Sequence, residues 1–280
     1  MEILHRFVIN KGLPITKESI MNISKDIIVE DSPGFLSVEI SENDKNCFKL
    51  SNIMRANSAF ETVETLFNQK EIDEAEWLYV RSKWQCAYPQ PRDGLRYLSI
   101  TYDAPLAMAK SSSPFVCRCN LQQVSPFVLN RTPVWKSKCF TMLNWVYDEL
   151  FVCDYARKLL EQSDLRGFGF YELLDPKGNM LGDISQIMIH DTLKKGLNES
   201  CIDKMSTCLN CGERKHILKP GPLIYDRKAF CGIETDIVKT SEIFGEITGS
   251  RYILVSHRFY EFIHKKGLDK TIVYVPVQLI

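Results

Sequence analysis

The chain has 280 residues, of which 45% are hydrophobic and 25% are charged, a composition typical of a folded globular protein. Its 35 basic and 35 acidic residues give a formal net charge of zero, so it lacks the basic excess of a dedicated nucleic-acid-binding protein. No apolar stretch approaches the ~20 residues that cross a bilayer, and the apolar run at residues 7–9 is too short for a signal peptide. These features predict a cytoplasmic protein that binds neither membranes nor, as its main task, nucleic acid.

The N-terminal region, residues 1–135, is predicted to be an α+β region of short strands and helices. Alternating apolar and polar side chains over residues 35–40 indicate a half-buried strand. Ser58 and Glu61 have the spacing of a capping box, and apolar residues at helical spacing follow, which predicts an amphipathic helix over residues 58–70. We expect a domain boundary near residue 135.

The C-terminal region, residues 136–280, contains two segments with the same pattern of apolar and polar residues. Residues 149–173 and 252–276 each read as a strand, a capping residue, a short amphipathic helix and a second strand. The segments align without a gap at an offset of 103 residues, so that Val152 matches Val255. This pattern predicts a duplicated strand–helix–strand unit, although such units are also common by chance. The predicted fold class is α+β, with mixed sheets and short helices.

The chain contains ten cysteines, which in a protein of this length without a secretion signal do not predict a disulfide framework. Most are expected to be small buried apolar residues. The exception is Cys208-Leu209-Asn210-Cys211-Gly212, because this spacing directs two thiols to one point and the glycine permits the positive φ of a knuckle. A structural zinc ion needs four ligands, so Cys208 and Cys211 predict half of a zinc site. The candidates for its other ligands are Cys201, Cys231, His216 and the Cys117/Cys119 pair.

Two other interpretations of this motif stay open. One is a knuckle that keeps its turn but binds no metal. The other is a redox-active dithiol, which requires the cysteines at the start of a helix that follows a strand. Gly212 and the prolines further along favour a loop and a hairpin instead.

The sequence contains no nucleophile elbow, phosphate-binding loop, dinucleotide fingerprint or metalloprotease motif, so we predict a protein without catalytic activity. Ser256 and His257 adjoin at a strand–helix junction, where a catalytic pair could lie. Their counterparts in the first segment are Cys153 and Asp154. The simpler interpretation is therefore that Ser256 and Asp154 cap the two helices.

Residues 252–258, the Gly267-Leu268 turn and the final strand with Pro276 and Val277 carry a resemblance to a known family. With the repeated segment upstream, they resemble the C-terminal region of bacterial immunity proteins from polymorphic-toxin systems, over roughly residues 149–280. The cysteine knuckle is similar to that of the double-CXXCG group. The chain departs from that group in having one Cys-x-x-Cys-Gly motif, because Cys117-Arg118-Cys119 is at most a degraded first copy.

The resemblance implies a bacterial protein that neutralises a cognate toxin domain by stoichiometric protein–protein binding. It would act without catalysis. The cysteine spacing, and not the resemblance, predicts as its only cofactor a structural zinc ion at Cys208 and Cys211, with Cys231 and Cys201 as candidate further ligands. The alternative is a zinc-ribbon-containing regulatory or nucleic-acid-binding protein, which the zero net charge disfavours.

Overall fold

The structure of the chain is a computed structural model that describes residues 1–11, 15–24, 27–92, 96–103, 119, 121–208, 211–246 and 249–280. Two compact units form, one of residues 1–71 with 220–222 and one of residues 72–219 with 223–280. The chain thus divides after residue 71 and not near residue 135, because strands at residues 77–86 pair with strands of the C-terminal region. No helix in the described part of the chain is long and apolar enough to cross a membrane.

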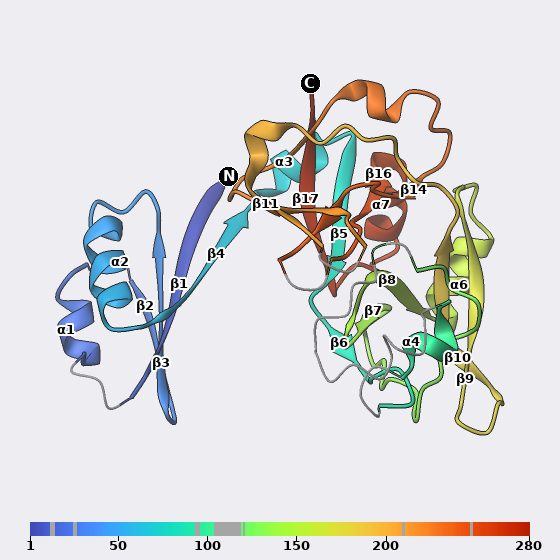
Figure 1. Ribbon diagram of the computed structural model, residues 1–280, viewed down its shortest axis with the longest axis horizontal. Helices are drawn as coiled ribbons and strands as arrows, with labels where there is room; N and C mark the ends of the chain where they lie inside the picture. Colours follow the sequence, from blue (N-terminus) through green and yellow to red (C-terminus); the bar gives the residue numbers. More distant parts are fainter. Residues whose placement is uncertain are drawn as a thin grey trace. The chain divides into compact units, whose positions relative to one another are not determined.

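In the part of the first unit that the structure describes, a four-stranded antiparallel sheet packs with two helices. Its elements in chain order are β1 (Glu2–Asn10), α1 (Lys17–Met21), β2 (Ile28–Ser32), β3 (Phe35–Ser41), α2 (Cys47–Ala56) and β4 (Phe60–Leu66). The strand order is β2-β3-β1-β4 (Figure 1). Phe7 and Val38 from the sheet share a core with Leu50 and Met54 of α2. The predicted strand at residues 35–40 is confirmed as β3.

The helix predicted over residues 58–70 is wrong, because β4 occupies most of that segment. Glu61 does not cap a helix; its carboxylate accepts hydrogen bonds from Arg55, with 2.7 Å between Arg55 Nε and Glu61 Oε2, and contacts His5. β4 pairs with β1 along its whole length. This ladder of hydrogen bonds, together with the β-branched residues of the segment, outweighs the local capping signal.

The described residues of the second unit form two five-stranded sheets and one three-stranded sheet. Its strands are β5 (Trp77–Ser82), β6 (Gln85–Cys86), β7 (Phe140–Leu143), β8 (Val146–Cys153), β9 (Phe168–Leu174), β10 (Met180–Ile189), β11 (Ile202–Thr207), β12 (Arg214–Leu218), β13 (Leu223–Tyr225), β14 (Ile237–Lys239), β15 (Ile243–Phe244), β16 (Ile253–Ser256) and β17 (Ile272–Leu279). The strand orders are β6-β7-β8-β10-β9, β13-β17-β5-β16-β14 and β11-β12-β15. The helices are α3 (Gln69–Asp73), which leads into this unit, α4 (Leu98–Thr101), α6 (Asp154–Glu161), α7 (His257–Lys265) and the 3₁₀ helices η1 (Glu199–Cys201) and η2 (Arg227–Phe230).

The two predicted strand–helix–strand segments have the same topology. β8 and β9 run parallel on either side of β10, and β16 and β17 run parallel on either side of β5. In each sheet the middle strand is antiparallel to both neighbours, and one more antiparallel strand, β7 or β14, lies beside the first strand. The predicted α+β class with mixed sheets is confirmed. The middle strands differ in origin, because β10 follows its segment in the chain whereas β5 precedes its own.

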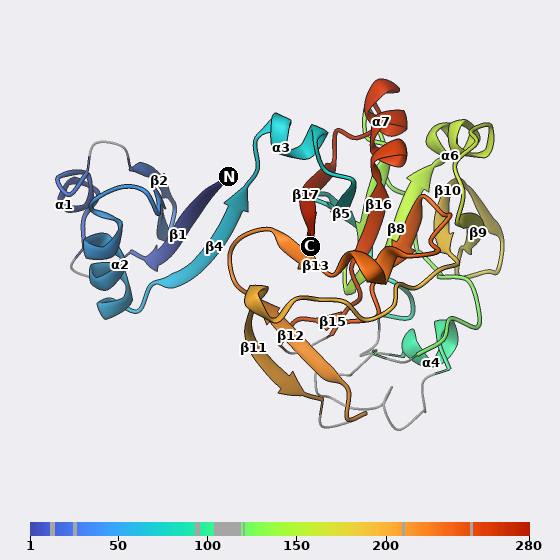
Figure 2. The same ribbon diagram turned by 90° about the horizontal axis from the view of Figure 1, so that it is seen from above.

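Both helices bury one face in a single core that the two five-stranded sheets share. Ala156 and Leu160 of α6 lie in this core together with Phe259 and Ile263 of α7. Figure 2 shows the two helices on the same side of the unit. Within this core α6 packs on β8 and β10 and α7 packs on β16 and β5, and this tertiary packing explains how such short helices are stable.

The first residue of each helix is preceded by a side-chain cap. Ser256 Oγ accepts a hydrogen bond from the Phe259 N–H at 3.2 Å, so the predicted cap of α7 is confirmed. The predicted cap at Asp154 is wrong, because Cys153 holds that position and its Sγ accepts from the Ala156 N–H at 3.5 Å. Asp154 is the first helical residue.

A candidate three-cysteine metal centre

Cys208 and Cys211 lie at the tip of the hairpin between β11 and β12. Thr207 pairs with Arg214 across the hairpin, and beyond this pair the Cys208 N–H donates to the Glu213 carbonyl at 2.8 Å. The Gly212 N–H donates back to the Cys208 carbonyl at 2.9 Å, and Gly212 has a φ of +73°. A side chain would be strained at this φ, so the glycine allows the turn that the sequence predicted.

A third cysteine, Cys119, lies at this tip. The sulfur atoms of Cys119, Cys208 and Cys211 all lie within 4.8 Å of one another. Cys119 and Cys208 are each 6% exposed and pack with Ile243 of β15, whereas Cys211 is exposed. The cluster therefore has a buried inner side and one ligand at the surface.

Gly249 allows the close packing behind the cluster. A Cβ atom at this position would lie 2.3 Å from Ile243 Cγ2 and 3.2 Å from Cys119 Sγ. Lys215 of β12, which is 5% exposed, approaches the same position with its Cδ at 3.5 Å. The aliphatic part of the buried Lys215 side chain thus helps to fill the space next to Gly249.

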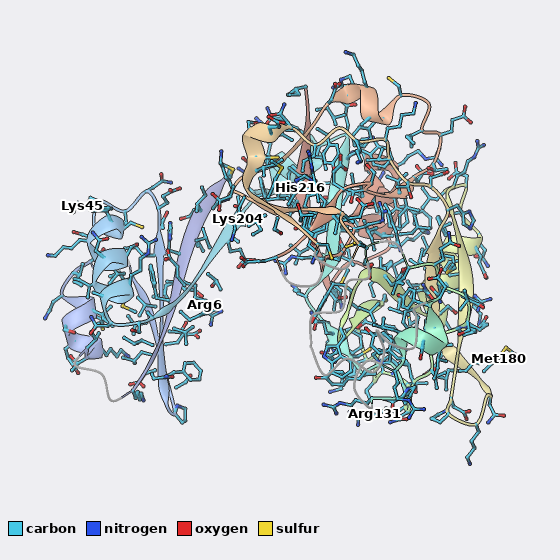
Figure 3. All side chains as sticks on the ribbon, viewed as in Figure 1. Arg6, Lys45, Arg131, Met180, Lys204 and His216 are labelled. Atoms are coloured by element: carbon cyan, nitrogen blue, oxygen red, sulfur yellow. The ribbon has the colours of Figure 1, made fainter. Side chains whose placement is uncertain are left out.

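The other predicted ligands do not join this group. Cys201 lies in η1, where its Sγ donates to the Asn198 carbonyl at 3.0 Å, and Cys231 is exposed after η2. His216 lies on the β11–β12 hairpin (Figure 3), directly after Lys215. Because successive strand residues point to opposite faces, the two side chains lie on opposite faces of the hairpin. Burial lowers the pKa of His216. Cys117 lies outside the described residues.

Three sulfur atoms at this spacing suit a soft divalent metal. Zn²⁺ binds deprotonated cysteine sulfur at ~2.3 Å, and structural zinc sites with four ligands are tetrahedral. The three described thiols can provide three corners of such a site. The sequence alone could not select Cys119 among the candidates, because its distance from the knuckle in the chain carries no spacing signal.

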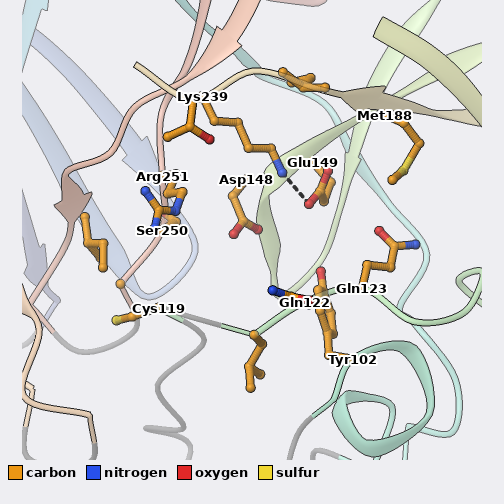
Figure 4. A pocket seen from close by; sticks show the side chains of 15 residues that line it. Tyr102, Cys119, Gln122, Gln123, Asp148, Glu149, Met188, Lys239, Ser250 and Arg251 are labelled. Carbon is orange, nitrogen blue, oxygen red and sulfur yellow. Dashed lines mark hydrogen bonds and ion pairs between the residues drawn. The ribbon is translucent and has the colours of Figure 1, made fainter. Parts of the chain in front are cut away.

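A polar cavity of about 340 Å³ adjoins the cluster, with Cys119 in its wall (Figure 4). In the cavity wall, Lys239 Nζ lies 2.5 Å from Glu149 Oε1. Gln186 Nε2 donates to Glu149 Oε2 at 3.1 Å. Burial raises the pKa of Glu149, while Lys239 and Gln186 act in the opposite direction. Gln186 also exchanges hydrogen bonds with Gln123. The sequence analysis missed this network because its members come from distant strands and loops and form no local motif.

Comparison with known proteins adds no relative. No protein-family model matches the chain, and a search of curated proteins finds no match either.

Proposed function

We propose that this protein is a binding protein that neutralises a toxin domain by stoichiometric association and that carries a structural zinc ion at Cys119, Cys208 and Cys211. The observation that supports the metal is the convergence of the three sulfur atoms within 4.8 Å at a hairpin tip. A third cysteine favours coordination over a two-cysteine redox motif, which needs no third thiol. The zinc ion would fasten the segment at Cys119 to the β11–β12 hairpin.

The support for the immunity function is the resemblance over residues 149–280, joined to the repeated topology of that region. Balanced charge suits recognition of another protein by shape and local charge rather than general attraction to phosphates. In this role aromatic anchors and rim charges would supply affinity and discrimination.

Elemental analysis of the protein purified without added zinc tests the metal. We expect about one zinc ion per chain, as structural sites hold their metal tightly. Cys119→Ser and Cys208→Ser should each lower this ratio, and Cys231→Ser, at an exposed cysteine outside the group, is the matched control. Substitution by Co²⁺ should give thiolate charge-transfer bands that weaken in the first two variants only. A folded wild-type protein with a ratio near zero would overturn the zinc proposal.

Co-expression with the toxin domain encoded by the neighbouring gene tests the function. The full chain should protect the cells and co-purify with the toxin domain in an equimolar complex. A protein that binds zinc but neither protects nor associates would refute the immunity function and leave the metal centre standing. A gel shift with steep salt dependence would instead favour the zinc-ribbon nucleic-acid-binding alternative.

A further inference from the structure

A second pair of cysteines lies in the second unit, apart from the metal centre. Cys139 directly precedes β7, and Cys153 ends β8. Phe140 pairs with Val152 in the antiparallel ladder, so Cys139 and Cys153 are the next opposed pair. The Cys153 N–H donates to the Cys139 carbonyl at 3.0 Å, and both residues are buried in the core beneath α6.

The environment of the two thiols is not equivalent. Cys153 Sγ accepts the N–H of Ala156 at the start of α6, where the partial positive charge of the helix end favours an anion. The hydrogen bond from Cys139, with the N–H groups of Ala156 and Tyr155, lowers the pKa of Cys153 to about 6, although burial opposes this. The same hydrogen bond, aided by burial, raises the pKa of Cys139. The helix end and these hydrogen bonds therefore favour the thiolate form at Cys153 over the thiolate form at Cys139.

A cavity of about 450 Å³ gives access to both cysteines. Lysines outnumber the aspartates in its wall. Lys138 stacks its ammonium over the ring of Trp84 at 4.0 Å, and Asp154 pairs with Lys158, outside the wall, at 2.6 Å. The titratable residues that line the cavity, besides the two cysteines, are Lys136, Lys138, Lys266, Lys270, Asp154, Asp183 and Tyr155. The excess of cations stabilises a thiolate and attracts anionic or strongly polar reactants.

We propose that Cys139 and Cys153 are a redox-active dithiol that reduces hydroperoxides and closes to a disulfide. The Cys153 thiolate attacks one peroxide oxygen; an S–O bond forms, the O–O bond breaks, and the departing oxygen takes a proton and leaves as alcohol or water. The Cys139 thiol then attacks the sulfenic sulfur of Cys153; an S–S bond forms and the S–O bond breaks. The hydroxide that leaves takes the thiol proton as water. The dithiol loses two electrons and the hydroperoxide gains them.

The position of the pair suits both steps. The two residues already oppose each other across adjacent strands, so the sulfur atoms need only move together to the ~2.05 Å of a disulfide. The corresponding cap in the second segment, Ser256, cannot do this chemistry, since a hydroxyl is not oxidised in this way. The proposal does not depend on the proposed function or on the metal.

Peptide mapping by mass spectrometry after treatment with one equivalent of hydrogen peroxide tests this assignment in the full chain. We expect a Cys139–Cys153 disulfide in the wild type that dithiothreitol reverses. In Cys139→Ser the reaction should stop at a sulfenic acid that dimedone traps on Cys153. Cys153→Ser should lose both products, and Ser256 shows that serine can cap a helix at this position, so this variant should fold. Cys47→Ser, at a buried cysteine of the first unit, is the control that should react as the wild type does.

The peptide readout separates this pair from the metal ligands. Absence of the disulfide in the wild type, or dimedone labelling of Cys153 no faster than that of Cys47, would overturn the proposal. If the wild type forms the disulfide but Cys139→Ser gives no dimedone adduct on Cys153, the proposed order of the steps is wrong.

Discussion

The two strand–helix–strand segments of the second unit have the same architecture but differ in the chemistry of one position. In both, a side chain at the end of the first strand accepts a hydrogen bond from the third residue of the helix. Ser256 does so with a hydroxyl that also donates to Asp236 at 2.7 Å. Cys153 does so with a thiol that faces a second thiol. The comparison teaches that the fold requires only an acceptor at this position, so the reactivity of the side chain is free to differ between the segments.

The two five-stranded sheets that hold these segments are not independent, because they share one core and one ion pair. Lys239 of β14 forms an ion pair with Glu149 of β8, and this pair joins the five-stranded sheet that contains β14 to the one that contains β8. Variants that remove this ion pair, or that change matched positions in the two segments, measure how much each contact contributes to the free energy of unfolding.

The largest effect is expected for Lys239→Met. This change leaves the Glu149 carboxylate buried without its cation, and loss of one partner of a buried pair lowers the free energy of unfolding by about 3–5 kcal/mol. The loss should shrink at low pH, because burial raises the pKa of Glu149 and its protonated form needs no cation. Urea denaturation at several pH values measures this. The double variant Lys239→Met/Glu149→Gln should recover much of the loss, and equal losses in both variants would contradict the argument.

Leu160→Ala and Ile263→Ala are matched changes on the two helices, since each residue is 1% exposed in the shared core. Each should lower the free energy of unfolding by about 2–5 kcal/mol. Residues that share a core couple, so the loss in the double variant should differ from the sum of the single losses. Strict additivity in denaturation experiments would show that the helices are packed independently.

A smaller effect is expected at the caps. Ser256→Ala removes the cap of α7 and should cost about 1 kcal/mol of unfolding free energy, with a further loss because Asp236 loses a donor. Below pH 6, where the Cys153 thiol is protonated, Cys153→Ser keeps an acceptor at the corresponding position and should cost less. Thermal unfolding of the two variants measures the difference, and a larger loss for Cys153→Ser would contradict the equivalence of the two caps.

The last comparison varies the pH, which should change both the stability and the reactivity that depend on Cys153. The pKa of Cys153 is lowered from 9.0 to about 6, so its thiolate stabilises the folded state increasingly as pH rises from 6 to 9. This contribution is complete above the unfolded value and is lost as pH falls through about 6. Relative to Cys153→Ser, the wild type should therefore gain stability over this range. Iodoacetamide should alkylate Cys153 at pH 7 about tenfold faster than an ordinary thiol. A rate that rises about twofold from pH 6 to pH 7 and then stays constant up to pH 9 agrees with this pKa, and a rate that rises steadily up to pH 9 does not.

Local signals predicted the repeated segments well. The apolar spacing of Ala156, Leu159 and Leu160 matches a helix that does bury this face, and both flanking strands lie close to their predicted positions. Where local and non-local forces compete, the sequence misleads, as at β4, whose capping signal yields to pairing with β1. The sequence also does not predict that β5 and β10 are the middle strands, because strand order in a sheet depends on distant partners.

The candidate site was predicted in part for the same reason. Cys208 and Cys211 lie within one turn, so their spacing defines the knuckle directly. Cys119 joins them only through the tertiary fold, where Gly249 and Ile243 leave room for it. The sequence predicts that most of the cysteines are buried, and Cys139 and Cys153 are buried, but only the register of the two strands places them opposite each other.

The place of β5 in the middle of the second sheet sets an order of events during synthesis on the ribosome. Val80 pairs with Ile253 on one side and with Tyr274 on the other, so both edges of β5 wait for strands that are translated long afterwards. The other five-stranded sheet, β6-β7-β8-β10-β9, is by contrast fully translated once β10 has emerged. Until β16 and β17 emerge, the nascent chain carries an apolar strand with two open edges, the kind of feature that chaperones shield.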